Sequence, residues 1–289
     1  MAVDVLQEKI RKKKNPTMLL LACGPRELPP DFQPELSPAR RYGAYYSQML
    51  ELLQDTVPAV RVSFSSFAIL GPEGLTVLPQ LLHQARSLGY YVALDAPQML
   101  SAQAAAQTAD LFLGETCPYD FDGLILPSYL GSDILKPFLP GCKRQQKDVF
   151  VIARTSNRSA SELQDLLTGF RLVHMAAADH ANRCAGDTIG RHGFSQVGIV
   201  AGASSADSLK MLRTTYPQLF MVLDGSDYPN ANARNCSFAF DRFGHGAVAC
   251  IGSSVTESWS KAKEGDWQTA VTTAAERMKK NMNRYLTIL

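Results

Sequence analysis

The chain has 289 residues, of which 46% are hydrophobic and 19% are charged, and its formal net charge is +2. A disordered chain would be poorer in apolar residues, and a protein that holds nucleic acid by bulk charge would be more basic. No apolar run approaches the roughly 18 residues of a membrane span. We therefore expect a soluble globular protein with no nucleic acid or membrane partner. Its length fits two average domains or one α/β barrel of about 250 residues.

Residues 1–16 are predicted to form an N-terminal helix. Val3, Leu6 and Ile10 recur at helical spacing, and a basic run over residues 11–14 follows them. Cations near the C-terminal end of a helix are favoured by its dipole. A signal peptide has the opposite order, with basic residues before the apolar stretch.

The cysteine pattern favours reduced thiols in a cytoplasmic protein. None of the six cysteines forms a Cys-x-x-Cys pair, and a chain of this length can build a core without disulfides. His180 and Cys184 are four residues apart in a predicted helix, but they lack a third ligand. We therefore predict no metal site.

Short apolar runs alternate with amphipathic stretches along the rest of the chain. The predicted strands are Thr17–Ala22, Ala59–Phe64, Tyr90–Leu94, Gly123–Leu126, Val149–Ala153, Val197–Ala201, Phe220–Leu223 and Ala247–Ile251. The predicted helices are Ala39–Leu53, Leu75–Leu88, Ala102–Leu113, a helix opened by a capping box at Ser161 and Gln164, Leu172–Arg191, Ser205–Thr215 and Thr256–Leu286, the last in one piece or two. Residues 224–245 lack periodicity and are predicted to be a polar loop.

Eight apolar strands separated by helices indicate an α/β protein with a parallel sheet. Eight such units favour a closed (β/α)8 TIM barrel, and no Gly-x-Gly-x-x-Gly follows the first strand as an open dinucleotide-binding sheet would require. We expect one domain over residues 1–289, with the N-terminal helix attached. Active sites of such barrels lie at the C-terminal strand ends, so the residues there are the candidates for function.

Several long motifs in the right order resemble the orotidine 5'-phosphate decarboxylase family, in its longer bacterial subgroup, over essentially the whole chain. The most specific motifs are Lys13–Thr17, Leu70–Leu75, Tyr129–Asp133, Arg154–Asn157 and Gly198–Ser204. The resemblance implies a cofactor-free decarboxylation of orotidine 5'-phosphate to UMP in pyrimidine biosynthesis. It also implies a Lys–Asp–Lys–Asp network that stabilises and protonates the carbanion.

The charged network of the family is altered in this chain. Asp95 matches its first carboxylate, but Pro97 stands in place of the proton-donating lysine and Leu100 in place of the second carboxylate. Arg61 replaces the lysine of the second strand. Strand alternation would point residues 95 and 97 to the same side, yet proline has no proton to transfer and arginine is a poor donor.

The phosphate and ribose contacts implied by the resemblance are altered too. The loop after the seventh strand carries Asp224 and Asp227, whose charges would repel a phosphate dianion. Val255 takes the place of the phosphate-binding arginine and Gly24 that of a ribose-binding aspartate. The residues left as ligand-binding candidates are Thr155, Ser156 and Asn157, whose counterparts contact the pyrimidine, and Gly252, Ser253 and Ser254, whose N–H groups can face an anion.

These replacements predict a family member that is catalytically inactive or altered. The alternatives are an active decarboxylase with a displaced catalytic lysine, a non-catalytic paralogue that binds a small nucleotide-like ligand or regulates a partner, and a barrel enzyme with a new reaction. Structural interpretations stay open as well: a buried ion pair between Asp95 and Arg61, a turn cap at residues 155–157, an internal salt bridge at Arg154 and a solvated turn at Asp224. The resemblance implies a homodimer through the barrel mouth, in which Leu100 would be buried.

Overall fold

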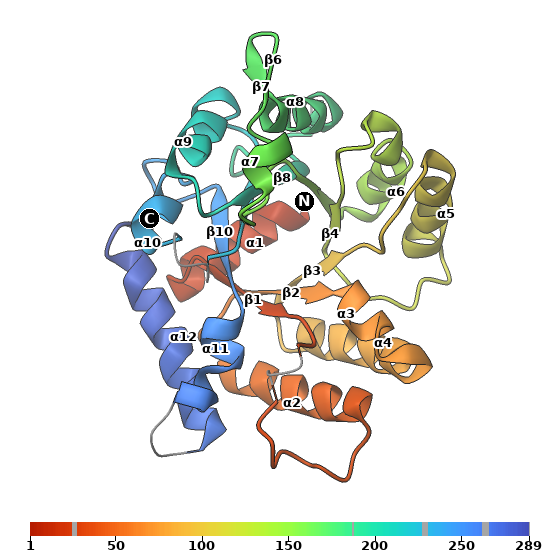
Figure 1. The fold of residues 1–289 in the computed structure, drawn as a ribbon, viewed down its shortest axis with the longest axis vertical. Helices are drawn as coiled ribbons and strands as arrows, with labels where there is room; N and C mark the ends of the chain where they lie inside the picture. Colours follow the sequence, from red (N-terminus) through yellow and green to blue (C-terminus); the bar gives the residue numbers. More distant parts are fainter. Residues whose placement is uncertain (25–27, 187, 227–230, 262–265, 289) are drawn as a thin grey trace.

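The computed structural model describes residues 1–24, 28–186, 188–226, 231–261 and 266–288. These residues form a closed barrel of parallel strands in the order β1-β10-β9-β8-β5-β4-β3-β2, with helices around it (Figure 1). β1 pairs with β2 on one side and with β10 on the other, which closes the sheet. The predicted (β/α)8 barrel is confirmed.

The elements follow one another in alternation along the chain. The barrel strands are β1 (Thr17–Leu21), β2 (Ala59–Ser63), β3 (Tyr91–Asp95), β4 (Gly123–Leu126), β5 (Asp148–Ile152), β8 (Val197–Gly202), β9 (Met221–Asp224) and β10 (Ala247–Ile251). The helices are α1 (Ala2–Lys13), α2 (Pro38–Leu53), α3 (Phe64–Ala68), α4 (Gly71–Ser87), α5 (Ala102–Leu113), α6 (Phe138–Gln145), α7 (Ala160–Leu163), α8 (Val173–Ala185), α9 (Ala206–Thr215), α10 (Ala233–Ser237), α11 (Ser253–Thr256) and α12 (Trp267–Asn283), with short 3-10 helices at Ser132–Ile134 and Ser258–Lys261. A hairpin of β6 (Leu167–Thr168) and β7 (Arg171–Leu172) precedes α8.

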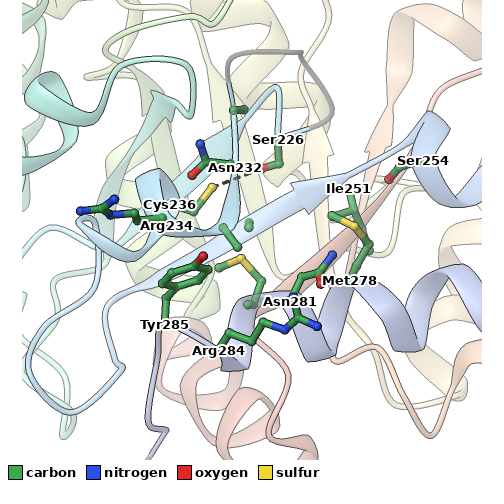
Figure 2. A pocket seen from close by; sticks show the side chains of 14 residues that line it. Ser226, Asn232, Arg234, Cys236, Ile251, Ser254, Met278, Asn281, Arg284 and Tyr285 are labelled. Carbon is green, nitrogen blue, oxygen red and sulfur yellow. Dashed lines mark hydrogen bonds between the residues drawn. The ribbon is translucent and has the colours of Figure 1, made fainter.

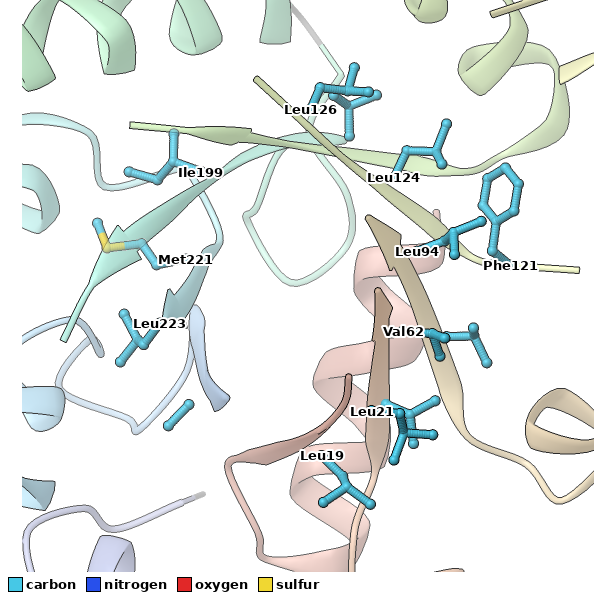
Figure 3. Packing of buried hydrophobic residues seen from close by; sticks show 14 of the residues in the cluster. Leu19, Leu21, Val62, Leu94, Phe121, Leu124, Leu126, Ile199, Met221 and Leu223 are labelled. Carbon is cyan, nitrogen blue, oxygen red and sulfur yellow. The ribbon is translucent and has the colours of Figure 1, made fainter. Parts of the chain in front are cut away.

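Each barrel strand buries both of its faces, which explains the nearly continuous apolar runs in the sequence. Outward-facing side chains such as Leu19, Leu124 and Leu223 pack against the helices (Figure 3). Inward-facing side chains form a second cluster that includes Phe150 and Phe220. The strands therefore leave only their two ends for polar chemistry.

Helix α1 closes the N-terminal end of the barrel. Its apolar residues Val3, Leu6 and Ile10 belong to the interior cluster, and the helix passes behind the strands in Figure 1. Gln7 Oε1 accepts a hydrogen bond from the N–H of Gly246 at 3.1 Å. The last turn carries the expected cations, so the sequence prediction of a helix with a basic C-terminal end is confirmed.

Two helix predictions were wrong in the segment between β5 and β8. The predicted capping box at Ser161 and Gln164 does not open a long helix, because α7 has only four residues and the Gln164 side chain accepts from the N–H of Thr155 instead. The predicted helix Leu172–Arg191 ends at Ala185, where Gly186 adopts a φ of 50°. Glycine takes this conformation without strain, and it ends the helix.

After β9 one more prediction was wrong, whereas the division of the stretch 256–286 agrees with the prediction of one or two helical pieces. Residues 224–245 are not all loop: Asp224 is the last residue of β9, and Ala233–Ser237 form α10. The predicted helix Thr256–Leu286 is divided, and its main part begins only at Trp267, where the Asp266 side chain caps the N–H of Thr269. Short polar turns within an amphipathic stretch explain these differences, because side-chain caps compete with a continuous helix.

A buried carboxyl group lies where α1 meets the barrel. Asp148, at the start of β5, is fully buried and accepts a hydrogen bond from Tyr91 Oη at 2.7 Å. Its other oxygen has no hydrogen-bond partner among the described residues. Burial raises the pKa of Asp148 well above its ordinary value, because the charged form loses its hydration. The folded protein therefore holds a proton here that the unfolded chain releases.

This proton makes stability depend on pH. Because the folded pKa is raised, the native state binds more protons than the unfolded state above about pH 4, so stability falls as pH rises toward the folded pKa. Asp148→Asn removes this titration. We therefore expect the unfolding free energy of the variant, relative to that of the wild type, to increase by up to about 1.4 kcal/mol per pH unit as pH rises. Urea unfolding at pH 5, 7 and 8.5 measures this difference. The exposed Asp110→Asn variant is the control, and parallel curves for Asp148→Asn and the wild type would contradict the prediction.

Candidate functional site

Three charged side chains meet at the C-terminal end of the barrel. Arg61 projects inward from β2, Asp95 ends the neighbouring β3, and Asp224 ends β9, which is separated from β2 by β1 and β10. Arg61 donates to both oxygens of Asp95, from Nε at 2.7 Å and from Nη2 at 3.2 Å. Its Nη1 donates to Asp224 Oδ1 at 2.7 Å. The ion pair between Arg61 and Asp95 that the sequence left open is present, with a third member.

Burial decides the electrostatics of these three residues. The side chain of Arg61 is 10% exposed, while those of Asp95 and Asp224 are 24% and 28% exposed. Burial alone would lower the pKa of Arg61, but Asp95 and Asp224 outweigh it and hold the pKa above its ordinary value. One positive and two negative charges give the group a formal charge of −1. Arg61 therefore stays charged and does not donate protons.

A neutral thiol lies in the barrel beside Arg61. Cys250 of β10 is buried, and burial raises its pKa to about 12, although Arg61 opposes the shift. A thiol with this pKa is protonated at neutral pH and is a poor nucleophile. Cys250 therefore contributes packing to the barrel interior.

The two positions after β3 that the resemblance marks as replaced differ in exposure. Pro97 is partly buried, whereas Leu100 is 85% exposed and points away from the core. The neighbouring Met99 is buried and anchors the segment. Lys136, the first lysine after β4, pairs with Asp133 at 3.2 Å on the surface, and both side chains are more than half exposed. Its ammonium is therefore engaged outside the mouth.

The segment Thr155–Asn157 after β5 is held by a hydrogen-bond network at the edge of the mouth. The Thr155 hydroxyl donates to Asn157 Oδ1 at 2.5 Å, and Ser156 Oγ donates to the carbonyl of Asp224 at 2.6 Å. A Cβ on Gly202 would lie 2.5 Å from the Thr155 carbonyl oxygen, so only glycine allows this approach. The network links the segment directly to the strand end that carries Asp224.

An ion pair anchors the loop that follows. Arg154 donates to both oxygens of Asp165, at 2.9 and 2.8 Å, so the predicted internal salt bridge is confirmed. Asp165 also lies 3.2 Å from Nδ1 of the buried His174 in α8. Bidentate pairing to Arg154 lowers the pKa of Asp165, and burial lowers that of His174, which keeps the imidazole neutral. These contacts tie the end of β5 to the segment after α7 and to the start of α8.

The segment after β10 begins a short helix rather than an open loop. Gly252 is the N-cap of α11, and Ser253 is its first residue. Val255, which the resemblance aligns with the family's arginine, is fully buried. Ser254 Oγ is buried, and it lines a cavity outside the barrel wall together with Ser226 and Ile251 (Figure 2). The serine side chains of this segment therefore do not all face the mouth.

The sequence treated Asp224 as part of a solvated turn, and this interpretation was wrong. Asp224 follows the inward-facing Val222 by two residues and the inward-facing Phe220 by four. Strand alternation would therefore have placed the Asp224 side chain inside the barrel as well. The predicted loop residues Asp227 and Pro229 lie outside the described residues. In the part of the chain that the structure describes, no three His, Cys, Asp or Glu side chains are grouped to hold a metal, and no helix is long and apolar enough to cross a membrane.

Sequence comparisons point to one group of proteins. An orotidine 5'-phosphate decarboxylase from Rhodopirellula baltica is 27% identical over 256 residues, with 85% of both chains covered. The enzyme of that name from Deinococcus radiodurans is 28% identical over 225 residues, covering 77% of this chain and 80% of its own length. No family model matches the chain.

Solved structures share the fold. The Leishmania donovani OMP decarboxylase is 22% identical, with a TM-score of 0.74 and 98% of both chains covered. The orotidine 5'-monophosphate decarboxylase from Methanocaldococcus jannaschii, solved with the inhibitor BMP, has a TM-score of 0.64 at 14% identity and covers 93% of this chain and 99% of its own.

The closed barrel, with its polar residues at the C-terminal strand ends, defines a protein of the (β/α)8 class. Within that class the curated relatives, aligned over most of the chain, carry a single name. The chain is similar over most of its length to curated orotidine 5'-phosphate decarboxylases, at 27% and 28% identity for the two described, and the resemblance predicted from its motifs is confirmed.

Replacing Arg61 tests the mouth. Arg61→Met leaves the carboxylates of Asp95 and Asp224 without their shared cation. We expect the unfolding free energy to fall by about 2–3 kcal/mol. This loss is smaller than that of a fully buried broken pair, because both carboxylates retain contact with water. Arg40→Met is the matched control, since it breaks only an exposed pair with Glu73 and should cost less than about 1 kcal/mol. Urea unfolding at neutral pH compares the two. Equal losses would show that the buried pairing adds no stability.

Proposed function

We propose that this family member does not decarboxylate orotidine 5'-phosphate. The observation that carries the proposal is the guanidinium of Arg61, which is paired with Asp95 and Asp224 at the place where the family reaction needs ammonium groups. A proton must reach the carbanion left by CO2, and an arginine whose pKa is raised above its ordinary value does not supply one. Pro97, which stands at the proton donor's position, carries no titratable group.

The charge of the mouth supports the same proposal. The group of Arg61, Asp95 and Asp224 has a formal charge of −1, and its two carboxylates retain contact with solvent. A phosphate dianion brought near these carboxylates would be repelled. At the position of the family's arginine, the fully buried Val255 offers no compensating charge.

A second candidate function is ligand binding without turnover. Residues Thr155–Asn157, whose family counterparts contact the pyrimidine, are held by Gln164 and Asp224 at the edge of the mouth. A fixed polar segment beside partly exposed carboxylates favours a small polar, nucleoside-like ligand or a new reaction at the same place. Whichever of these applies, the six free thiols support the cytoplasmic location that we propose.

The first test is a decarboxylation assay with the purified protein. We expect no loss of orotate absorbance from orotidine 5'-phosphate over hours at high protein concentration, while a curated relative assayed in parallel turns the substrate over. The triple variant Arg61→Lys, Pro97→Lys, Leu100→Asp restores the charged groups of the family and should gain measurable turnover. Wild-type turnover comparable to that of the relative would overturn the proposal.

We also propose a homodimer that covers part of the barrel mouth. Three apolar side chains follow consecutive strands on this face: Ile69 after β2, Leu100 after β3 and Leu130 after β4, exposed by 84%, 85% and 54%. Exposed apolar side chains grouped on one face are typical of interaction surfaces. A second copy related by two-fold symmetry would bury the same face on both partners.

Charge placed on this face should separate the two copies. We expect the wild type to elute as a dimer at micromolar concentration and the variant Leu100→Asp, Leu130→Asp to elute as a monomer, because burying unpaired carboxylates is costly. Leu111→Asp is the control, since Leu111 is 53% exposed on α5 away from the strand ends. Size-exclusion chromatography with light scattering gives the masses, and a monomeric wild type would contradict the proposal.

A further inference from the structure

A second cavity lies outside the barrel wall, between β10, α10 and the C-terminal part of α12 (Figure 2). Its volume is about 660 Å³, within the range of small-molecule sites. Among the described residues after β9, α10 covers the outer face of the sheet here, and it has only five residues. A longer helix at this position would fill the space.

The inner wall of the cavity is apolar. Ala249 and Ile251 face it from β10, and Met278 and Met282 face it from α12. Cys236 of α10 completes this wall, and burial raises its pKa to about 11, so the thiol is neutral. Methionine side chains adapt to the shape of a bound molecule, which suits a flexible apolar ligand.

The outer rim is positively charged. Arg234 of α10 and Arg284, which follows α12, both line the cavity and are exposed. Among the described residues, the ion pairs with arginine involve neither Arg234 nor Arg284. No carboxylate belongs to the described lining, so the two guanidinium groups give it a formal charge of +2. Guanidinium groups bind oxyanions through paired N–H donors.

An unused polar atom lies at the other end of the cavity from Arg234 (Figure 2). Ser254 Oγ is buried and has no hydrogen-bond partner among the described residues. A buried hydroxyl without a partner costs free energy, and a bound molecule or water that accepts its proton removes that cost. The cavity thus offers apolar walls with hydrogen-bond donors at both ends.

We propose that this cavity binds an amphipathic anion, a molecule with an apolar body of medium length and an oxyanion head. The apolar body packs on Ile251, Met278 and Met282, while one of the rim guanidinium groups, that of Arg234 or that of Arg284, pairs with the head. The inference does not depend on the proposed function, because Arg61 and Asp95 do not line this cavity.

The test uses octanoate as the probe, with octanol and octyltrimethylammonium as neutral and cationic analogues. In protein labelled with 13C at its methionine methyl groups, octanoate should shift the signals of Met278 and Met282, out of nine methionines, in a saturable manner. Met278→Leu and Met282→Leu assign the two signals. Equal shifts from the cationic analogue, or shifts confined to other methionines, would overturn the proposal.

Charge reversal at the rim completes the test. Arg234→Glu with Arg284→Glu should weaken octanoate binding at least tenfold. The control, Arg183→Glu with Lys280→Glu, changes net charge equally at exposed positions outside the described lining, and should change binding less than twofold. Thermal unfolding checks that both double variants stay folded. Unchanged octanoate affinity in the rim variant would overturn the proposal even if the methyl signals shift.

Discussion

The pairing of Arg61 with Asp95 and Asp224 is the interaction on which the candidate site depends. A guanidinium inside a barrel loses its hydration, and it is stable there only because two carboxylates at the strand ends accept its protons. These contacts also engage the guanidinium and carboxylate groups that would otherwise be free to bind a ligand. The arrangement of the charged side chains at the barrel mouth is therefore determined by the need to balance the buried charge of Arg61. This requirement limits the chemistry that the mouth can perform.

The two ends of the barrel treat buried charge in different ways. At the closed end, Asp148 meets only a tyrosine hydroxyl and the start of α1, so it keeps its proton. At the open end, Asp95 and Asp224 have a cation and some contact with water. The apolar interior between them, which includes Phe150 and Phe220, separates the two groups. A change of charge at one end should therefore leave the other end unaffected.

Most of the fold could be predicted from the sequence, because each strand buries both faces and stands out as an apolar run. The helix ends could not be predicted as well: Gln164 looks like a capping residue, but a tertiary contact with Thr155 uses its side chain. The pair of Arg61 and Asp95 was open to sequence analysis because neighbouring strand ends carry both residues. The pairing of Asp224 with Arg61 was missed, since this contact depends on barrel closure between residues 163 positions apart.

The position of α1 has a consequence for how the chain folds during synthesis. Its side chain Gln7 bonds to Gly246, 239 residues later, and Asn283 donates to the carbonyl of Lys14, 269 residues earlier. The sheet likewise closes only when β10 has been made and can pair with β1. α1 and β1 therefore complete their contacts only after segments much further along the chain are made, and their apolar faces stay uncovered until then. Apolar surface that stays exposed during synthesis favours aggregation, so the long-range contacts of α1 and β1 make this step of folding the most exposed to it.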